Sequence, residues 1–171
     1  MKKTETDKLL RKIAEGDNLA FERLYAVTKR GVFSFLYTYF HNYEETEDAM
    51  QTVYLKVKMG ITSYRAGTNG SAWLLQIAKN HALNELARRR EYTPLHEVEI
   101  PTQSSFCEGS VTETMQRVLS EEERRILTLH VLWRYKHKEI AEALNLPLGT
   151  VTSKYKRAIE KMKEALKEEK V

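Results

Sequence analysis

The stretch from residue 136 to residue 161, KHKEIAEALNLPLGTVTSKYKRAIEK, constrains the fold of this chain more than any other. Apolar residues recur at helical spacing on both sides of the segment Asn145-Leu146-Pro147. Asparagine tolerates the left-handed conformation that a turn requires, and proline cannot continue a helix interior. The pattern therefore predicts a helix-turn-helix whose second helix starts near Gly149 and Thr150.

The second helix of this pair has two chemically different faces. One is apolar, and the other carries hydroxyl groups near the helix start and cations behind them. Such a face suits a helix in the DNA major groove, with phosphates alongside. A surface helix pair with a solvated basic face is the alternative left open. The apolar face comprises Val151, Tyr155, Ala158, Ile159, Met162 and Leu166, and the polar face Thr150, Ser153, Lys154, Arg157 and Lys161.

The composition limits the class of protein. The 171 residues suffice for one ordinary domain or two small ones, and the net charge of +4 fits an anionic partner without demanding one. No apolar run approaches the length of a membrane span, and the N-terminus lacks the apolar segment of a signal peptide, so we expect a cytoplasmic protein. Cys107 is the only cysteine and the five histidines lack metal spacing, so we expect no internal disulfide and no metal site. No cofactor is expected either.

The rest of the chain is expected to be all-α, because no convincing alternating strand pattern is present. A first helix over residues 5–15 should end at Gly16. Asp17 should cap a second helix that Gly31 bends or interrupts and whose core lies at residues 32–40. Inward positions at the start of this second helix are Phe21, Leu24 and Tyr25.

Two further helices complete a predicted first domain over residues 1–91. A capping box at residues 42–45 should open a helix to Met59, and after a polar loop Ser71 should cap a helix to Arg90. Residues 92–111 contain two prolines, no Lys or Arg and three Glu, which predicts a flexible linker. Residues 112–171 form the predicted second domain, where a capping box at residues 120–123 opens a helix through Trp133. Its apolar surface is assigned to Ile126, Leu129, Val131 and Leu132.

Two helices of the first domain have polar faces that the core does not need. Leu55, framed by Asp48, Gln51 and Thr52, suits docking to a helix of another protein, although a stray surface leucine has the same pattern.

The helix over residues 71–90 has the second such face. Trp73, Ile77, Asn80, Asn84 and Arg88 lie nearly opposite its buried stripe, which is Leu75, Ala78, Ala82 and Leu86. An aromatic ring, amides and cations are what a protein needs to hold unstacked bases. A core tryptophan with solvated asparagines is the alternative.

Three segments together resemble a known family: TEDAMQTVYLKV (46–57), SAWLLQIAKNHALNELARRR (71–90) and HKEIAEALNLPLGTVTSKYKRA (137–158). In this order and separation they are similar to extracytoplasmic-function (ECF) RNA polymerase sigma factors, with region 2 in the first domain and region 4 in the second. The resemblance implies binding to bacterial core RNA polymerase, through its beta-prime and beta subunits, and to promoter DNA. It also implies an anti-sigma factor as a partner.

The resemblance also assigns roles, including that of the linker, which matches a segment that threads toward the RNA exit path. Lys154 stands where arginine is common, and lysine does not make the bidentate guanine contact of arginine. The assigned positions are Asp48, Gln51, Thr52 and Leu55 for polymerase, Tyr64, Arg65, Asn69, Trp73, Asn80, Asn84 and Arg88 for the −10 element, and Thr150, Thr152, Ser153, Lys154, Lys156 and Arg157 for the −35 element.

Two other function classes remain to be compared with this reading. An ordinary helix-turn-helix regulator would bind duplex DNA without polymerase, but it has no use for a base-stacking face. An enzyme is disfavoured because Glu47 and Asp48 are adjacent, point about 100° apart on a helix and make a poor catalytic pair. The sequence contains no visible nucleophile–base motif or phosphate loop.

Overall fold

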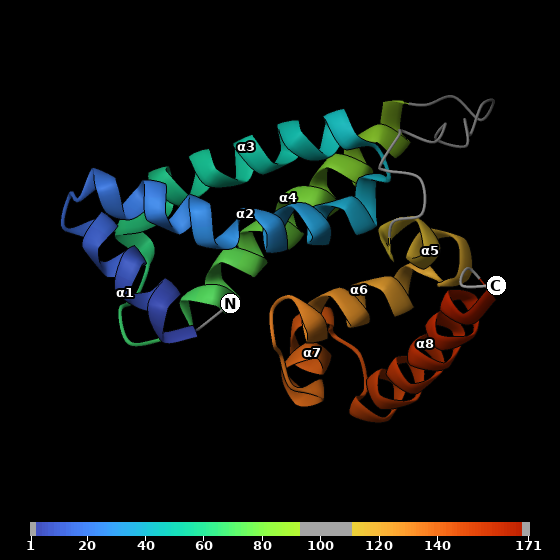
Figure 1. Ribbon diagram of the computed structural model, residues 1–171. Coiled ribbons are helices and arrows are strands. Elements are labelled where there is room, and N and C mark those ends of the chain that lie inside the picture. The colour runs from blue at the N-terminus through green and yellow to red at the C-terminus, as the bar shows by residue number, and fades with distance from the viewer. Residues whose placement is uncertain (1–2, 93–110, 169–171) are drawn as a thin grey trace. The chain divides into compact units, whose positions relative to one another are not determined.

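The computed structural model describes residues 3–92 and 111–168, which form helices, turns and no strand. The all-α prediction is confirmed for these residues. The predicted linker lies almost entirely outside them. The chain divides into two compact units, residues 1–102 and 103–171. The elements (Figure 1) are α1 (Lys3–Ala14), α2 (Asn18–Phe40), α3 (Tyr43–Gly60), the 3-10 helix η1 (Ile61–Ser63), α4 (Gly70–Tyr92), α5 (Val111–Val118), α6 (Glu121–Val131), α7 (His137–Leu144) and α8 (Leu148–Glu168).

The first two helix junctions follow their sequence signals. Gly16 has a φ of 93° beyond the end of α1, a left-handed conformation that glycine adopts readily. Asp17 then caps α2, because its Oδ1 accepts a hydrogen bond from the Ala20 N–H at 3.0 Å. Asn42 caps α3 in the same way, with Oδ1 3.0 Å from the Glu45 N–H. The predicted end of α1 and the caps at Asp17 and Asn42 are confirmed. The capping box at residues 42–45 is present only in its Asn42 half, because the Glu45 side chain pairs with Arg89 of α4 instead.

The second half of α2 supplies many of the buried residues of the first unit, and α2 as a whole packs against α1, α3 and α4. Gly31 does not interrupt α2, which runs from Asn18 to Phe40 as one helix. Gly31 is itself buried, and packing of the surrounding helix outweighs a helix penalty of about 1 kcal/mol for glycine. Tyr25 is 38% exposed rather than buried, and its ring lies beside that of Tyr54 with 4.9 Å between centroids.

The start of α4 differs from the sequence prediction. Asn69 is the capping residue, because its Oδ1 accepts a hydrogen bond from the Ala72 N–H at 3.2 Å. Ser71 is instead buried and donates its hydroxyl to Thr6 Oγ1 of α1. Both residues are good caps by type, so local sequence alone did not separate them. Leu75, Ala78 and Ala82 form the buried stripe of α4 as predicted, and Leu86 is half-buried.

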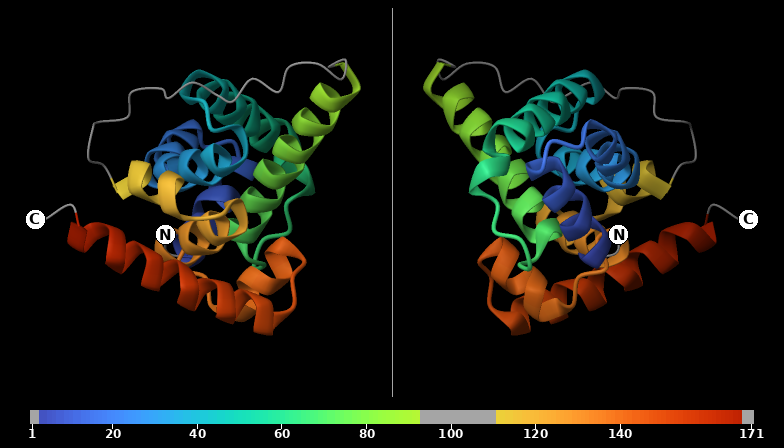
Figure 2. Two further views of the ribbon diagram at one scale, coloured as in Figure 1. Left: turned by 90° about the vertical axis from the view of Figure 1, so that its right-hand side faces the viewer. Right: turned by 90° about the vertical axis from the view of Figure 1, so that its left-hand side faces the viewer.

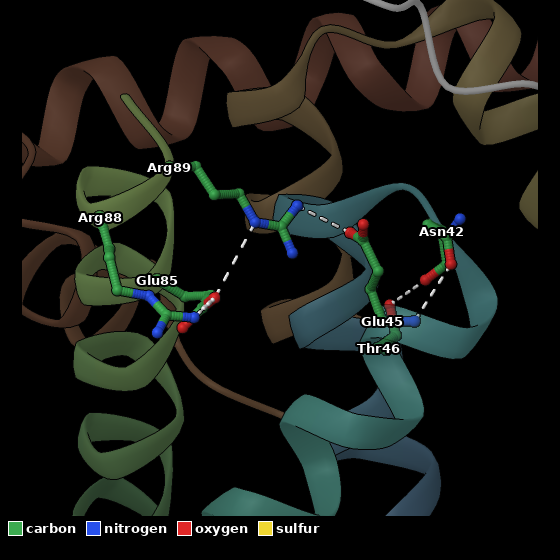
Figure 3. Close-up of polar contacts among 6 residues, drawn as sticks. All are labelled: Asn42, Glu45, Thr46, Glu85, Arg88 and Arg89. Carbon is green, nitrogen blue, oxygen red and sulfur yellow. Dashed lines mark hydrogen bonds and ion pairs between the residues drawn. The ribbon is translucent and has the colours of Figure 1, made fainter. Parts of the chain in front are cut away.

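The ends of α3 and α4 are joined by an ion pair (Figure 3). Arg89 Nη1 lies 2.8 Å from Glu45 Oε2. The Arg89 guanidinium also lies over the Phe40 ring, 5.5 Å from its centroid. Arg88 pairs within α4, with Nη2 2.6 Å from Glu85 Oε1. The Glu45 side chain of the predicted capping box therefore holds α4 against α3.

In the second unit, α5, α6 and α7 pack on α8, whose length Figure 2 shows. The capping box at the start of α6 is confirmed: Ser120 Oγ accepts from the Glu123 N–H, and Glu123 Oε2 accepts from the Ser120 N–H at 2.9 Å. The helix ends at Val131 rather than near Trp133. Val131 is 57% exposed, so its assignment to the apolar surface was wrong. Trp133 lies beyond the end of α6 and is fully buried.

The helix-turn-helix is confirmed in detail. Asn145 ends α7 in the left-handed conformation, with φ 58° and ψ 47°. The Leu146 N–H then donates to the Ala141 carbonyl at 2.9 Å, which closes the turn. The second helix, α8, begins at Leu148, one residue before the predicted start. Its buried residues are Val151, Ala158, Met162 and Ala165, with Tyr155, Ile159 and Leu166 half-buried.

Candidate nucleic-acid and protein interfaces

The face of α3 that turns away from the core is mixed apolar and polar. Leu55 is 61% exposed, Asp48 and Gln51 are exposed, and Thr52 is half-buried. Met59, one turn beyond Leu55, is 83% exposed and was not singled out from the sequence. Because Met59 is four residues after Leu55, the helical period could have placed both side chains on the same face. The buried residues of α3 are Thr46, Ala49, Met50, Val53, Tyr54 and Val57.

The face of α4 opposite its buried stripe carries exposed amides. Asn80 and Asn84 are exposed, and Gln76, one turn earlier, donates its Nε2 to Asn80 Oδ1 at 2.7 Å. Arg88 is exposed at the end of the same face. Trp73 is half-buried, with its ring 5.1 Å from that of Tyr64. Amide groups on a rigid helix can form hydrogen bonds to base edges, and a cation at its end can neutralise a phosphate.

The loop between η1 and α4 contains three predicted DNA contacts in different environments. Arg65 is exposed, and Asn69 is half-buried as the cap of α4. Tyr64 is 8% exposed, and its hydroxyl donates to Asp7 of α1. Burial, with the hydrogen bond to the Asp7 carboxylate, raises the pKa of Tyr64 to about 12. Tyr64 therefore remains a protonated donor inside the fold, and Arg65 is the cation of this loop that faces solvent.

The outward face of α8 presents hydroxyl groups and cations. Thr152, Ser153, Lys156 and Arg157 are exposed, and Thr150 and Lys154 are half-buried. Lys154 is paired, with Nζ 2.8 Å from Glu122 Oε2 of α6. The two exposed hydroxyls bond to main-chain carbonyls of their own helix, Thr152 to Leu148 at 3.0 Å and Ser153 to Thr150 at 3.1 Å.

A cluster of three rings lies behind this face. The His130 and His137 rings both contact Tyr155, with centroid distances of 4.6 and 4.8 Å, and they lie 5.3 Å from each other. His130 Nδ1 is 2.9 Å from the Tyr135 carbonyl oxygen. The cluster joins α6, α7 and α8, and it was missed because its histidines are seven residues apart on different helices.

These faces on two helical units, one of which contains a helix-turn-helix, define a helical DNA-binding protein. Family models identify which one. Sigma-70 region 2 matches residues 24–92, and Sigma-70 region 4 matches residues 113–162. The chain belongs to the sigma-70 family of bacterial RNA polymerase sigma factors, as one of its ECF members. It is a transcription initiation factor, not an enzyme, that binds core polymerase and directs it to promoters.

Curated relatives extend over nearly the same length. The RNA polymerase sigma-H factor of Pseudomonas aeruginosa is 26% identical, over 95% of this chain and 94% of the relative. The ECF sigma factor SigW of Bacillus subtilis is 21% identical, over 94% and 96%. The ECF sigma-E factor of Escherichia coli K12 is 27% identical, over 89% of each.

Solved structures share the fold. CnrH, in complex with the cytosolic domain of CnrY, has a TM-score of 0.65 at 18% identity and covers 95% of this chain and 97% of its own. The sigma factor RpoE of Bartonella quintana, in complex with the anti-sigma factor NepR, has a TM-score of 0.66 at 22% identity, with 86% and 96% covered. Among the described helices of this chain, none has both the length and the apolar character needed to cross a bilayer.

Proposed function

We propose that the two units divide promoter recognition between them. Residues 1–91 bind core polymerase and the −10 element, residues 112–171 bind the −35 element, and residues 92–111 link them. The observation that carries this division is the exposed amide face of α4 in one unit and the exposed hydroxyl and cation face of α8 in the other. The first suits unstacked bases and the second suits a duplex groove.

The polymerase contact is proposed for the outward face of α3. Its exposed apolar side chain, Leu55, supplies area that is desolvated on binding, and Asp48, Gln51 and Thr52 supply hydrogen bonds that fix the register. Met59 extends the same face by one turn.

The −10 contact is proposed for α4 and the loop before it. Asn80 and Asn84 form hydrogen bonds to base edges, and the Trp73 ring stacks on a base. Arg88 and Arg65 contact phosphates. Asn69 and Tyr64 belong to the same site but are engaged by the fold, the first as a helix cap and the second through Asp7. Their proposed role is therefore to shape the loop.

The −35 contact is proposed for the first three turns of α8. Its exposed hydroxyls meet base edges or phosphates, and its cations neutralise phosphates. The proposed contacts are Thr150, Thr152, Ser153, Lys154, Lys156 and Arg157.

Regulation by an anti-sigma factor is part of the proposal. RpoE of Bartonella quintana, which has this fold, is bound to one.

The chain would act in the cytoplasm, where core polymerase is found. The acidic linker would pass toward the RNA exit path of the polymerase.

The test is reconstitution with purified core polymerase on a promoter fragment. We expect permanganate-reactive thymines near position −10 only when the chain and core polymerase are both present. A helix-turn-helix regulator would instead protect duplex DNA by itself and leave every thymine unreactive, which would overturn the proposal.

A further inference from the structure

One carboxylate of α1 holds both ends of the turn that precedes α4. Asp7 Oδ1 accepts a hydrogen bond from the Tyr64 hydroxyl and a second one from the Gly67 N–H at 3.1 Å. The other carboxylate oxygen, Oδ2, lies 3.3 Å from Arg11 Nη2. Residues 65 and 66, including the exposed Arg65, are thus confined between two anchored positions that lie 57 and 60 residues from Asp7 in the sequence.

The next part of the loop is pressed against α1 as well. Gly70 is buried, and a Cβ there would lie 2.8 Å from Leu10 Cδ1 and 3.0 Å from the Asp7 main-chain nitrogen. Beside it, buried Ser71 donates to buried Thr6 at 3.2 Å between hydroxyl oxygens. A larger side chain at Gly70 would require the Leu10 side chain and the main chain of α1 at Asp7 to shift. The position of α1 therefore sets where the loop ends and α4 begins.

The turn itself also has internal bonds. The Thr68 hydroxyl donates to the Arg65 carbonyl at 2.7 Å, and Gly67 adopts a φ of 84°. Because Asp7 bonds to both sides of this turn, loss of its carboxylate frees the turn at two points at once. The Tyr64 hydrogen bond is the main cause that holds the pKa of Asp7 below its ordinary value, so the acceptor is charged at neutral pH.

We propose that Asp7 is a positioning residue for promoter opening: it holds residues 64–70 in the conformation that receives the −10 bases, although it touches no DNA itself. The inference rests on the proposed −10 role of this loop and of α4. It adds α1 to the elements that determine −10 selectivity.

The experiment compares holoenzymes reconstituted from core polymerase and the full chain, either wild-type or with Asp7→Ala. Two quantities are measured: the rate of open-complex formation, by permanganate reactivity, and the preference among single-base variants of the −10 element. The expected result is a rate at least about tenfold lower and a −10 preference that is flattened, because an ångström-scale misplacement of contacts costs at least this much. Affinity for core and for a −35 duplex should be unchanged.

Two further variants separate positioning from stability. Asp17→Ala removes the cap of α2 in the same unit without touching the loop, so it should lower thermal stability while the −10 preference stays as in wild type. Tyr64→Phe removes one of the two anchored bonds and should flatten the preference partly, even if Asp7→Ala fails to fold.

The inference is overturned if Asp7→Ala and Tyr64→Phe both keep the wild-type −10 preference, or if Asp17→Ala flattens it equally. If wild-type holoenzyme itself opens no promoter, the proposed function fails and this inference fails with it. If it opens promoters normally and the loop variants do too, only the role of Asp7 is wrong.

Discussion

Lys154 of α8 and Glu122 of α6 form an ion pair with 2.8 Å between Nζ and Oε2, although Lys154 is one of the proposed −35 contacts. Lys154 is 26% exposed and Glu122 is 45% exposed, so the pair is partly solvated. Such pairs contribute about 0.2–1 kcal/mol. Lys154 must therefore break its ion pair with Glu122, or keep it while also contacting DNA, before it can neutralise a phosphate.

The first prediction concerns that carboxylate. Glu122→Gln should tighten binding to a −35 duplex by roughly two- to fivefold. Without the Glu122 carboxylate, DNA binding does not have to break an ion pair of Lys154, and one negative charge that repels the phosphates is removed. Fluorescence anisotropy with a labelled duplex measures it. Glu121→Gln is the matched control, since Glu121 pairs with Arg125 on the same helix. If both variants tighten binding equally, the effect comes from the change in net charge and not from the Lys154–Glu122 ion pair.

The second prediction concerns Arg157, which is exposed on the polar face of α8. Arg157→Ala should weaken −35 binding and lower the slope of log affinity against log salt by about 0.9, the value for one lost phosphate contact. Lys163→Ala removes an equal charge from the same helix beyond the last of the proposed contacts and should leave the slope nearly unchanged. An unaltered affinity and slope for Arg157→Ala would refute the contact.

The third prediction concerns the α3 face. Leu55→Asp should abolish co-purification with core polymerase while the circular dichroism spectrum stays helical, because a charge replaces the apolar group that is desolvated on docking. Leu19→Asp is the control, since Leu19 is 69% exposed on α2. Normal recovery of core by Leu55→Asp would place the docking surface elsewhere.

The fourth prediction concerns the pH dependence of the second unit. Burial alone would raise the pKa of Glu123, but the hydrogen bonds from Lys161 and Ser120 outweigh it and hold the pKa below its ordinary value of 4.5. Lys161 Nζ lies 2.8 Å from its Oε2. Because the folded-state pKa is the lower one, this stabilisation is complete above the ordinary pKa and is lost as pH falls through the folded-state value.

Glu123→Gln should therefore lower the free energy of unfolding by about 1–2 kcal/mol at pH 7 and flatten its fall below about pH 5. Fluorescence of buried Trp133, in a Trp73→Phe background, reports unfolding of this unit alone. Glu164→Gln, an exposed site on α8, is the control. A variant that keeps the wild-type acid transition would contradict the assignment.

The helix-turn-helix could be predicted closely from sequence because its determinants are local. Asn145 signals a left-handed turn, and the period of 3.6 residues separates buried Val151 and Ala158 from exposed Arg157. The same period separated Leu55 from the core of α3. For both helices, the burial of an amphipathic face leaves only one orientation.

The contacts that sequence reasoning missed join polar residues far apart in the chain. Asp7 with Tyr64, Glu45 with Arg89 and Lys154 with Glu122 each depend on how helices pack, and no periodic pattern encodes such pairs. Tyr64, which the sequence suggested as a DNA contact, is buried and bonded to Asp7 of α1. The cap at Asn69 was missed because a serine two residues later has the same local preference.

The most direct test of the central claim is run-off transcription with purified bacterial core polymerase over a genomic fragment library. We expect discrete transcripts that need both the chain and core polymerase, and that disappear with Leu55→Asp. Transcripts that are unchanged by the chain, together with specific duplex binding by the chain alone, would contradict it.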